Sequence, residues 1–277
     1  MPDADATPPR VAVVSPHLDD AVLSIGASIA DWTSRGAEVR VITAFAGDAP
    51  SLLSPVARAY HDSSGLGADA MATRRAEDEA AAAAVGASTC HLPFPDAVYR
   101  RREDGSWLCD GMRSMFDSRL PEDGRLGPDL ANAIIEHCRG DAAPHVLVTC
   151  AGFGGHVDHR LTRRAVLAAA RATGLPAMLW EDLPYMLGSR RRGIAGSAWP
   201  YAAAPAAWEH KWRAVEAYGS QLRLHWHDDR WRTQLHEHAV DRGDGVAVEL
   251  FWPEAAGAAE GTDRPPPWLR QRDDRPR

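Results

Sequence analysis

Short apolar runs alternate with longer helix-type segments along the first two thirds of the chain. The apolar runs are rich in β-branched residues, as buried strands are, and cover residues 11–14, 38–45, 88–92, 145–150 and 177–180. Between them, alanine-rich segments with the apolar spacing of amphipathic helices cover residues 20–35, 70–86, 129–139 and 159–173. This alternation predicts βαβ units around a mostly parallel sheet, in a Rossmann-like three-layer α/β/α fold.

Two connections between the expected elements are longer than a simple turn requires: residues 47–69 and residues 93–128. Long loops in a compact domain are usually functional or disordered. In an open α/β sheet, ligands bind beyond the carboxyl ends of the strands, so we expect both loops to lie over that end. We assign residues 1–255 to a single domain. Residues 256–277, rich in Pro, Gly, Asp and Arg, are expected to form a C-terminal tail that is mobile or strapped across the surface.

The composition limits the classes of partner. The chain has 277 residues and a formal charge of -7, which disfavours nucleic acid because phosphate binding needs a clustered basic surface. The basic stretch SRRRG at 189–193 is typical of a solvated charge run. No apolar segment approaches the length of a membrane span, and MPDADATPPR lacks the basic and then apolar order of a signal peptide. We therefore expect a cytoplasmic protein that binds neither membrane nor nucleic acid.

Several common types of site have no motif in this chain. The four cysteines form no C-x-x-C pair, so neither a thiolate zinc site nor a disulfide framework is indicated, and we expect reduced, mostly buried thiols. No glycine-rich dinucleotide motif and no P-loop is present. Ser15 and Ser220 lack the G-x-S-x-G context of a serine nucleophile.

Two clusters of acidic residues and histidines follow directly after predicted strands. SPHLDD contains His17, Asp19 and Asp20, and AGFGGHVDHR contains His156, Asp158 and His159. The first cluster alone is explained as well by a capped helix with a hydrogen-bonded histidine. The second cluster favours a functional site, because two clusters at the carboxyl ends of strands in one sheet can converge on the same crevice.

The residue types in these clusters suit a catalytic metal ion. Two histidines and one carboxylate with open coordination positions are typical of Zn²⁺, with Fe²⁺ as the competitor. Such an ion polarises a carbonyl group and lowers the pKa of a bound water from 15.7 to about 7. A neighbouring carboxylate that is not a ligand could accept the proton of that water. The spacing of His156 and His159 places both on one side of a helical turn, so that one could bind metal while the other faces substrate.

The paired motifs P-H-x-D-D at 16–20 and H-x-D-H at 156–159 resemble those of the zinc-dependent N-deacetylases of the PIG-L/LmbE family. These enzymes remove acetyl groups from N-acetylated amino sugars. The resemblance implies one Zn²⁺ per chain, held by His17, Asp20 and His159, with Asp19 as general base. It further implies that His156 stabilises the oxyanion or helps to protonate the leaving amine, and that Asp158 orients a histidine.

The resemblance extends less specifically over about residues 11–252. Arg74 and Glu77 look like the family's R-x-x-E helix, whose arginine reaches the substrate, and Asp96 looks like an aspartate that holds sugar hydroxyls. The segments KWRAVEAYGSQL and VELFW look like the family's C-terminal elements. The chain departs from the pattern at Leu18, where proline is usual, and at Ala21, where glutamate is common. Gly154 stands where some members have a tyrosine, so a catalytic tyrosine at this position does not carry over.

The remaining histidines and most tryptophans have a plainer interpretation. Four histidines and two aspartates near the C-terminus are expected to decorate an exposed strand or loop and to be structural: His225, His227, Asp228, Asp229, His236 and His238. Eight of the ten tryptophans lie at or beyond Trp180, which favours core packing there, although they could instead form an aromatic wall for a large or acylated substrate. Trp107, in the second long connection, is the tryptophan that we expect to contact the ligand.

We therefore expect a metal-dependent hydrolase that removes the N-acetyl or N-acyl group of an amino sugar. The segments PHLDDAVLS and GGHVDHR look most like the enzymes that deacetylate the glucosamine of glycopeptide antibiotics, so a secondary-metabolite glycoconjugate is the first candidate substrate. A small glucosaminyl thiol precursor of the mycothiol type is the second. A two-metal phosphoesterase and a non-catalytic, metal-stabilised sugar-binding module are the alternatives. The sequence carries no signal for oligomeric state or acyl-chain length.

Overall fold

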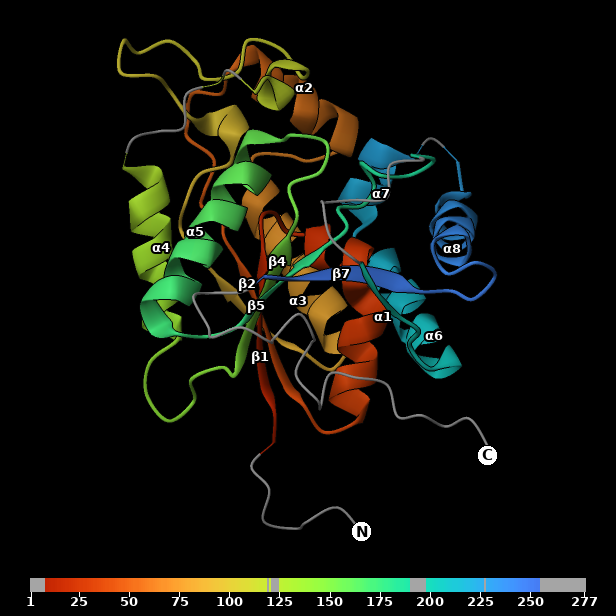
Figure 1. Ribbon diagram of the computed structural model, residues 1–277. Coiled ribbons are helices and arrows are strands. Elements are labelled where there is room, and N and C mark those ends of the chain that lie inside the picture. Colours follow the sequence, from red (N-terminus) through yellow and green to blue (C-terminus); the bar gives the residue numbers. More distant parts are fainter. Residues whose placement is uncertain (1–7, 119, 121–124, 190–197, 227, 255–277) are drawn as a thin grey trace, which may run out of the picture.

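The computed structural model describes residues 8–254 apart from 119, 121–124, 190–197 and 227 (Figure 1). Its seven strands form one sheet in the order β3-β2-β1-β4-β5-β7-β6. They are β1 (Arg10–Ser15), β2 (Glu38–Thr43), β3 (Ser88–His91), β4 (Val146–Cys150), β5 (Ala177–Trp180), β6 (Trp199–Tyr201) and β7 (Glu249–Glu254). The first five strands are parallel, whereas β7 runs antiparallel to β5 and to β6. The predicted mostly parallel sheet is confirmed, with β6 and β7 as an antiparallel addition at one edge.

Eight helices are described: α1 (Asp20–Ser34), α2 (Pro55–Ser64), α3 (Ala70–Ala84), α4 (Leu126–His137), α5 (Val157–Thr173), α6 (Pro205–Glu216), α7 (Gly219–His225) and α8 (Trp231–Arg242). Helices α4 and α5 cover one face of the sheet, and α1, α3 and α6 cover the other (Figure 1). The strand residues alternate between the two faces: Val11 and Val13 pack in the cluster under α1, whereas Ala12 and Val14 pack in the cluster under α5. Because both faces are covered, the central strands are apolar throughout, as the sequence pattern indicates.

The order of the strands fixes where a ligand site can form. Strand β1 pairs with β2 on one side and with β4 on the other, because the chain moves outward through β2 and β3 and then returns to the far side of β1. The crevice beyond the carboxyl ends of two strands at such a reversal is the usual ligand site of an open α/β sheet. His17 follows β1 and His156 follows β4, so both predicted clusters lie at this crevice.

The prediction of a loop over residues 47–69 is wrong for part of its length, because α2 lies within it. The Ser54 hydroxyl accepts a hydrogen bond from the Ala57 amide (2.9 Å), Pro55 occupies the first turn, and Gly65 ends the helix with φ +66°. These are standard start and stop signals. Figure 1 shows α2 near the carboxyl end of the sheet. The second connection, 93–128, contains two 3-10 turns and the start of α4.

The expectation of an exposed strand or loop around the C-terminal histidines is also wrong. His225 ends α7, and His236 and His238 lie in α8, where the His238 ring is buried and contacts Glu181. His227, most of the 189–193 stretch and residues 256–277 lie outside the described residues. Most of the later tryptophans support the core, as expected; those with buried side chains are Trp180, Trp208, Trp212, Trp226 and Trp252.

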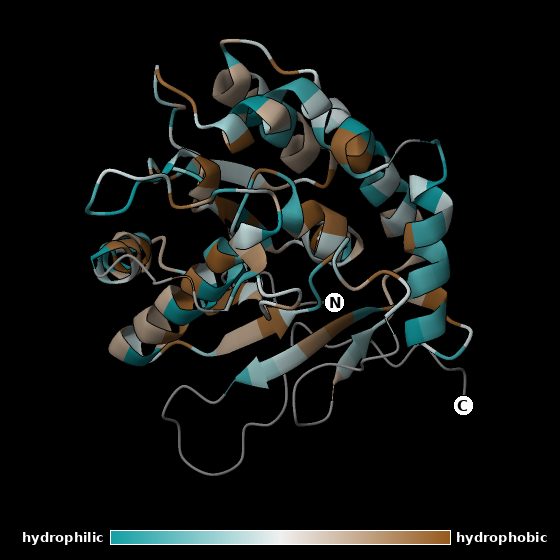
Figure 2. Ribbon diagram, turned by 90° about the horizontal axis from the view of Figure 1, so that it is seen from above, coloured by the Kyte–Doolittle hydropathy of each residue, from teal (hydrophilic) through white to brown (hydrophobic). Residues whose placement is uncertain are grey.

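The apolar side chains are concentrated in the centre of the molecule. In Figure 2 brown segments lie mostly in the inner part of the ribbon, whereas the head of the β7 arrow and much of α8 are teal. Among the described helices, none combines the length and the hydropathy that a membrane crossing requires.

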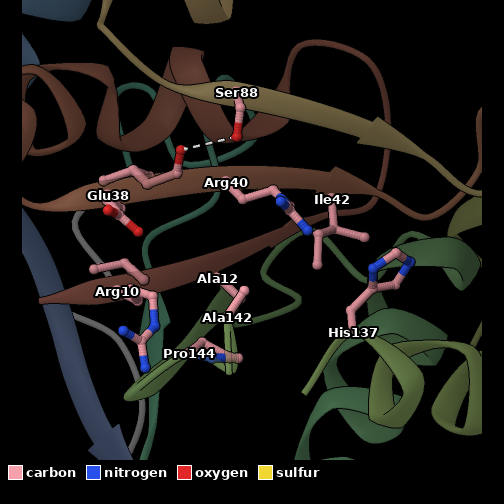
Figure 3. A pocket seen from close by; sticks show the side chains of 11 residues that line it. Arg10, Ala12, Glu38, Arg40, Ile42, Ser88, His137, Ala142 and Pro144 are labelled. Atoms are coloured by element: carbon pink, nitrogen blue, oxygen red, sulfur yellow. Dashed lines mark hydrogen bonds between the residues drawn. The ribbon is translucent and has the colours of Figure 1, made fainter. Parts of the chain in front are cut away.

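A cavity of about 230 Å³ opens at the opposite end of the sheet from the two clusters (Figure 3). Arg10 and Ala12 of β1, Glu38 and Arg40 of β2, and His137 of α4 line it. Because these strand residues precede the carboxyl ends of β1 and β2, this cavity is separate from the crevice that holds the clusters.

Candidate metal centre and active site

The first cluster is shaped by the turn that joins β1 to α1. The Ser15 hydroxyl donates to the His17 carbonyl (2.7 Å) and accepts from the Ala21 amide (3.1 Å), which closes the turn. The His17 amide donates to Asp20 Oδ2 (2.8 Å), and His17 Nδ1 lies 3.1 Å from the same oxygen. The His17 ring and the Asp20 carboxylate therefore face one another at the first turn of α1.

The second cluster is shaped by the start of α5. His156 is the N-cap of this helix, and its Nδ1 accepts a hydrogen bond from the Asp158 amide (3.2 Å). In a neutral imidazole the other nitrogen must then carry the proton. Burial and the neighbouring His17 hold the pKa of His156 well below its ordinary value, which favours this neutral form. His156 thus presents an Nε2–H donor, which lies 3.0 Å from Met115 Sδ.

His159 connects the two clusters. Its Nδ1 lies 2.6 Å from Asp182 Oδ1, and Asp182 also accepts a hydrogen bond from the Phe153 amide (3.0 Å). Its Nε2 lies 3.3 Å from Asp20 Oδ2 but has no hydrogen-bond partner within the described part of the chain, although it is buried. Three potential ligand atoms therefore converge: His17 Nδ1, Asp20 Oδ2 and His159 Nε2.

The electrostatics of this cluster favour a positive charge. Burial opposes ionisation, but Asp96 and other neighbouring carboxylates raise the pKa of His17 to about 10. Burial likewise opposes the charged form of His159, yet Asp20 and Asp182 raise its pKa well above the ordinary value. Although burial alone would raise it, contacts with the two imidazoles hold the pKa of Asp20 well below its usual range. An arrangement that stabilises charge on both rings also stabilises a cation placed between them.

In other groups of candidate ligands, side-chain atoms already contact other protein groups. Three triplets bring ligand atoms within 4.8 Å of one another: His17, His156 and His159; Cys150, His159 and Asp182; and His17, Asp96 and Asp158. Asp158 already accepts from the Ala97 amide (2.9 Å), pairs with the Arg100 guanidinium and contacts His17 Nε2 (3.1 Å). In the second triplet, the Cys150 thiol donates to the His159 carbonyl (3.4 Å), and Asp182 Oδ1 contacts His159 Nδ1 (2.6 Å). In the first triplet, both His156 nitrogens already have contacts: Nδ1 with the Asp158 amide (3.2 Å) and Nε2 with Met115 Sδ (3.0 Å). The position between His17, Asp20 and the His159 Nε2, which has no hydrogen-bond partner among the described residues, is therefore better for an ion.

Two nitrogens and one carboxylate oxygen fit a catalytic zinc site, which leaves one coordination position for water or substrate. The ring nitrogens on the far side are each held by a carboxylate: Asp158 contacts His17 Nε2, and Asp182 contacts His159 Nδ1. Such carboxylate contacts fix the tautomer and orientation of ligating histidines. The structure thus brings together the predicted ligands and places Asp158 where it can orient His17.

Asp19 lies at the edge of this cluster. Its Oδ1 is 3.7 Å from Arg74 Nη2, and its Oδ2 is 3.7 Å from His225 Nε2. Both distances are longer than a hydrogen bond, and the carboxylate makes no capping bond to α1. The Asp19 oxygens therefore remain available to accept a proton, although the side chain is buried and lies between two basic groups.

Arg74 and Asp96 form a polar wall beside the metal cluster. Arg74 is almost fully buried, with Nη1 3.9 Å from Asp96 Oδ2, and its guanidinium lies over the Tyr60 ring at 5.6 Å. The Tyr60 hydroxyl donates to Gln221 Oε1 (3.1 Å), which ties α2 to α7. The structure thus places Arg74 and Asp96 within reach of one another and of the two clusters. Trp107 lies in the second long connection, where Arg101 Cζ stacks 3.6 Å from the centre of its ring.

Sequence reasoning missed Asp182, Tyr185 and the position of His225. Asp182 lies two residues after the end of β5, which neighbours β4, and this position at the carboxyl end of a strand was a usable signal. The Tyr185 ring lies edge-to-face against His159 at 5.1 Å, and it packs on the backbone of Gly154, where a Cβ would lie 2.9 Å from Tyr185 Cβ. The proximity of His225 to Asp19 depends on the packing of α7, which local sequence does not encode.

Comparison with known proteins identifies the family of the chain. Residues 12–170 match the family model described as PIG-L: GlcNAc-PI de-N-acetylase. The chain belongs to the PIG-L family. Among curated PIG-L relatives, 2'-N-acetylparomamine deacetylase of Streptomyces fradiae is 32% identical over 178 residues, which cover 64% of this chain and 57% of that protein. The chain thus matches little more than half the length of this relative.

Solved structures of deacetylases match over a larger share of the chain. One is a deacetylase of the teicoplanin biosynthesis pathway, solved as a bog complex, with a TM-score of 0.80, 37% identity and coverage of 88% of this chain and 97% of that chain. Another is the zinc-inhibited form of teicoplanin deacetylase, with a TM-score of 0.76, 35% identity and the same coverage. The PIG-L/LmbE resemblance and the Rossmann-like fold expected from the sequence are therefore confirmed.

Proposed function

We propose that this chain is a zinc-dependent hydrolase that removes the N-acetyl or N-acyl group from an amino sugar on a secondary-metabolite glycoconjugate, with the glucosamine of a glycopeptide antibiotic as the first candidate. The observation that carries this proposal is the convergence of His17 Nδ1, Asp20 Oδ2 and the unpaired His159 Nε2 at the crevice between β1 and β4. The likeness to teicoplanin deacetylases supports the choice of substrate class.

His17, Asp20 and His159 would hold one Zn²⁺ per chain. When bound, the ion supplies Lewis acidity, which polarises an amide carbonyl and acidifies water. Asp182 and Asp158 keep the two imidazoles in the tautomers that turn a lone pair toward Asp20. Fe²⁺ suits the same ligand set, so the identity of the metal is tested by elemental analysis.

The surrounding side chains supply the remaining steps of amide hydrolysis. Asp19 accepts the proton of the attacking water, because its oxygens are not committed to a capping bond. The neutral His156 donates its Nε2–H to the carbonyl oxygen, on which negative charge develops as the tetrahedral intermediate forms. Asp19 then gives this proton to the amide nitrogen as the C–N bond breaks, so that the sugar leaves as the amine and the acyl group as a carboxylate.

Arg74 and Asp96 are suited to hold the sugar. Asp96 can accept hydrogen bonds from hydroxyl groups, and the Arg74 guanidinium, 3.9 Å away, helps to hold that carboxylate in place. Glu77, which follows Arg74 on α3, accepts hydrogen bonds from the Ser220 amide and hydroxyl and so fixes the start of α7 against this wall. Trp107 remains a proposed contact at the outer loop.

The test is incubation of the purified zinc-loaded enzyme with a panel of N-acetylglucosaminyl compounds, followed by mass spectrometry and an acetate assay. The panel includes a glycopeptide that carries N-acylated glucosamine, 2'-N-acetylparomamine and small glucosaminyl thiol precursors. Loss of the acyl group from the glycopeptide supports the first candidate. Preference for 2'-N-acetylparomamine, the compound in the name of one relative, would argue against the glycopeptide as substrate. Preference for a glucosaminyl thiol precursor would support the second candidate. Release of acetate from no compound would refute the deacetylase and favour a sugar-binding module.

The number of metal ions per chain distinguishes a metal-dependent phosphoesterase from the proposed deacetylase. Two-metal phosphoryl chemistry needs a second ion a few ångströms from the first, bridged by additional carboxylates. We expect one zinc per chain by elemental analysis, and a value near two would favour the phosphoesterase. The expected cytoplasmic location stays a prediction.

A further inference from the structure

Helix α1 is interrupted five residues after the Asp20 that begins it. Ile25 has non-helical dihedral angles (φ -130°, ψ 25°), so the regular hydrogen-bond ladder is broken there. In an unbroken helix, the Ser28 amide would donate to the Ser24 carbonyl. A break of this kind inside a buried helix exposes backbone groups that must find other partners. The break divides α1 into a short first half, which carries Asp20, and a longer second half.

A carboxylate from β7 accepts the hydrogen bonds of amides at the start of the second half of α1. Glu249 of β7 accepts hydrogen bonds from the Ala27 amide at Oε1 (3.1 Å) and from the Ser28 amide at Oε2 (2.7 Å). Its side chain therefore acts as an N-cap in the middle of α1, where the positive end of the helix dipole favours a negative charge.

The only lysine of the chain donates a hydrogen bond to a carbonyl at the end of the first half of α1. Lys211 of α6 donates from Nζ to the Ser24 carbonyl (3.2 Å) and to Glu249 Oε1 (2.6 Å). Its stem crosses α1 at Gly26, where a Cβ would lie only 3.0 Å from Lys211 Cγ. Lys211 and Glu249 are 1% and 4% exposed, so both charges are withdrawn from water. A buried ion pair often adds little net stability, because desolvation offsets the attraction, so its presence here calls for another role.

The first half of α1 is linked to both sides of the metal centre. Asp20 begins it, and the Ser24 hydroxyl at its end accepts a hydrogen bond from the Leu183 amide (3.0 Å). Leu183 follows Asp182, which holds His159 by its Nδ1. The orientation of this short helical segment therefore affects one carboxylate ligand directly and one imidazole ligand through two hydrogen bonds.

We propose that Lys211 and Glu249 are positioning residues for the metal centre: by capping the two halves of α1 at its break, they fix Asp20 and, through Ser24 and the Leu183 amide, the Asp182 that orients His159. The inference rests on the proposed metal site for its functional meaning. Its structural part, the local ordering of the two segments that carry these residues, is independent of any metal.

The test compares Lys211→Met with Arg232→Met as matched control. Arg232 pairs with Glu209 across α8 and α6 at 2.9 Å, so the control removes an exposed ion pair from the same region without contacting α1. Hydrogen exchange is measured on the full chain after chelator treatment, well below the unfolding midpoint. We expect exchange in residues 20–26 and 181–187 to rise at least about tenfold in Lys211→Met, while residues 146–150 and 165–173 stay unchanged. The control should leave all four segments unchanged.

Zinc affinity, measured by competition with a chromophoric chelator, is the second readout. We expect Lys211→Met to bind Zn²⁺ about tenfold more weakly than the native chain and Arg232→Met to bind it equally well. If Lys211→Met does not fold, Ser24→Ala replaces it; this change removes only the acceptor for the Leu183 amide and should accelerate exchange at 181–187 alone. A uniform rise in exchange over all four segments, or no rise in either site segment, overturns the proposal. Failure of the native chain to bind Zn²⁺ refutes the proposed function, while the exchange data still decide the positioning role.

Discussion

His159 and Asp182 share a buried contact of 2.6 Å between Nδ1 and Oδ1, and this contact turns the other ring nitrogen of His159 toward Asp20. Asp182 is itself held by the Phe153 amide. The same arrangement recurs across the cluster, where Asp158 contacts the outward nitrogen of His17. Both imidazoles are thus presented to a common point by carboxylates from α5 and from the segment after β5.

The first prediction concerns Asp182. We expect Asp182→Ala to weaken zinc binding by about 10- to 100-fold, because the His159 ring loses the partner that sets its tautomer and orientation. Asp182→Asn should bind zinc more tightly than Asp182→Ala, since the amide oxygen can still accept from Nδ1–H. Competition with a chromophoric chelator measures both affinities. Equal binding by the native chain and Asp182→Ala would contradict the role given to this residue.

The second prediction separates two possible ligand sets, of which one uses Asp20 and the other His156. Asp20→Ala should abolish stoichiometric zinc binding, because Asp20 Oδ2 lies between His17 Nδ1 and His159 Nε2. His156→Ala should retain zinc and lose about 10²- to 10³-fold in kcat, the usual cost of removing one donor to an oxyanion. Elemental analysis and steady-state kinetics on the same samples give both values. Loss of zinc in His156→Ala together with retention in Asp20→Ala would reverse the assignment.

The third prediction concerns the proton acceptor. Asp19→Asn should keep one zinc per chain and lose about 10²- to 10⁴-fold in kcat, because the amide cannot accept a proton from water. The substitution conserves size beside Arg74 and His225, so folding should be little affected. Circular dichroism melting and zinc content serve as controls. Full activity in this variant would remove Asp19 from the mechanism.

The sequence was sufficient to predict the features that local patterns encode. The alternation of apolar runs and helices indicates the parallel sheet, and the two histidine clusters stand at the ends of β1 and β4, which the topology makes neighbours. Helix α2 was also encoded, by the Ser54 cap and the Gly65 stop, but the length of the connection was taken to indicate a loop.

Features that depend on contacts between distant elements could not be predicted in this way. His225 approaches Asp19 because α7 is held in place by two contacts. Glu77 of α3 binds the start of α7, and Gln221 of α7 accepts a hydrogen bond from α2. The interruption of α1 is likewise unmarked locally, since Gly26 alone is tolerated in many helices and the compensating groups come from α6 and β7. Such pairings arise from tertiary packing, which a single sequence does not reveal.

The fourth prediction uses two glycines with nearly equal backbone angles. Gly154 has φ +83° and a Cβ there would lie 2.9 Å from Tyr185 Cβ, whereas Gly105 has φ +81° and open space around it. Gly105→Ala should lower the free energy of unfolding by only about 1 kcal/mol, the strain of the left-handed conformation. Gly154→Ala should cost about 1–3 kcal/mol more, because the methyl group overlaps the ring that packs on His159. Urea unfolding of both variants gives the difference; equal losses would show that Tyr185 moves aside freely.

The fifth prediction concerns the thiols. Burial raises the pKa of Cys109, Cys138 and Cys150 to about 11, and it also raises the pKa of the half-buried Cys90. A thiol with a pKa near 11 is only about 0.1% thiolate at pH 8, and the thiolate is the reactive form. Ellman's reagent at pH 8 should therefore label at most one thiol quickly in the native chain, and that signal should vanish in Cys90→Ser. The labelling rate should rise with pH, because a larger fraction of each thiol is then ionised. All four thiols should react after denaturation, and rapid labelling of two or more in the native chain would contradict the burial on which this prediction depends.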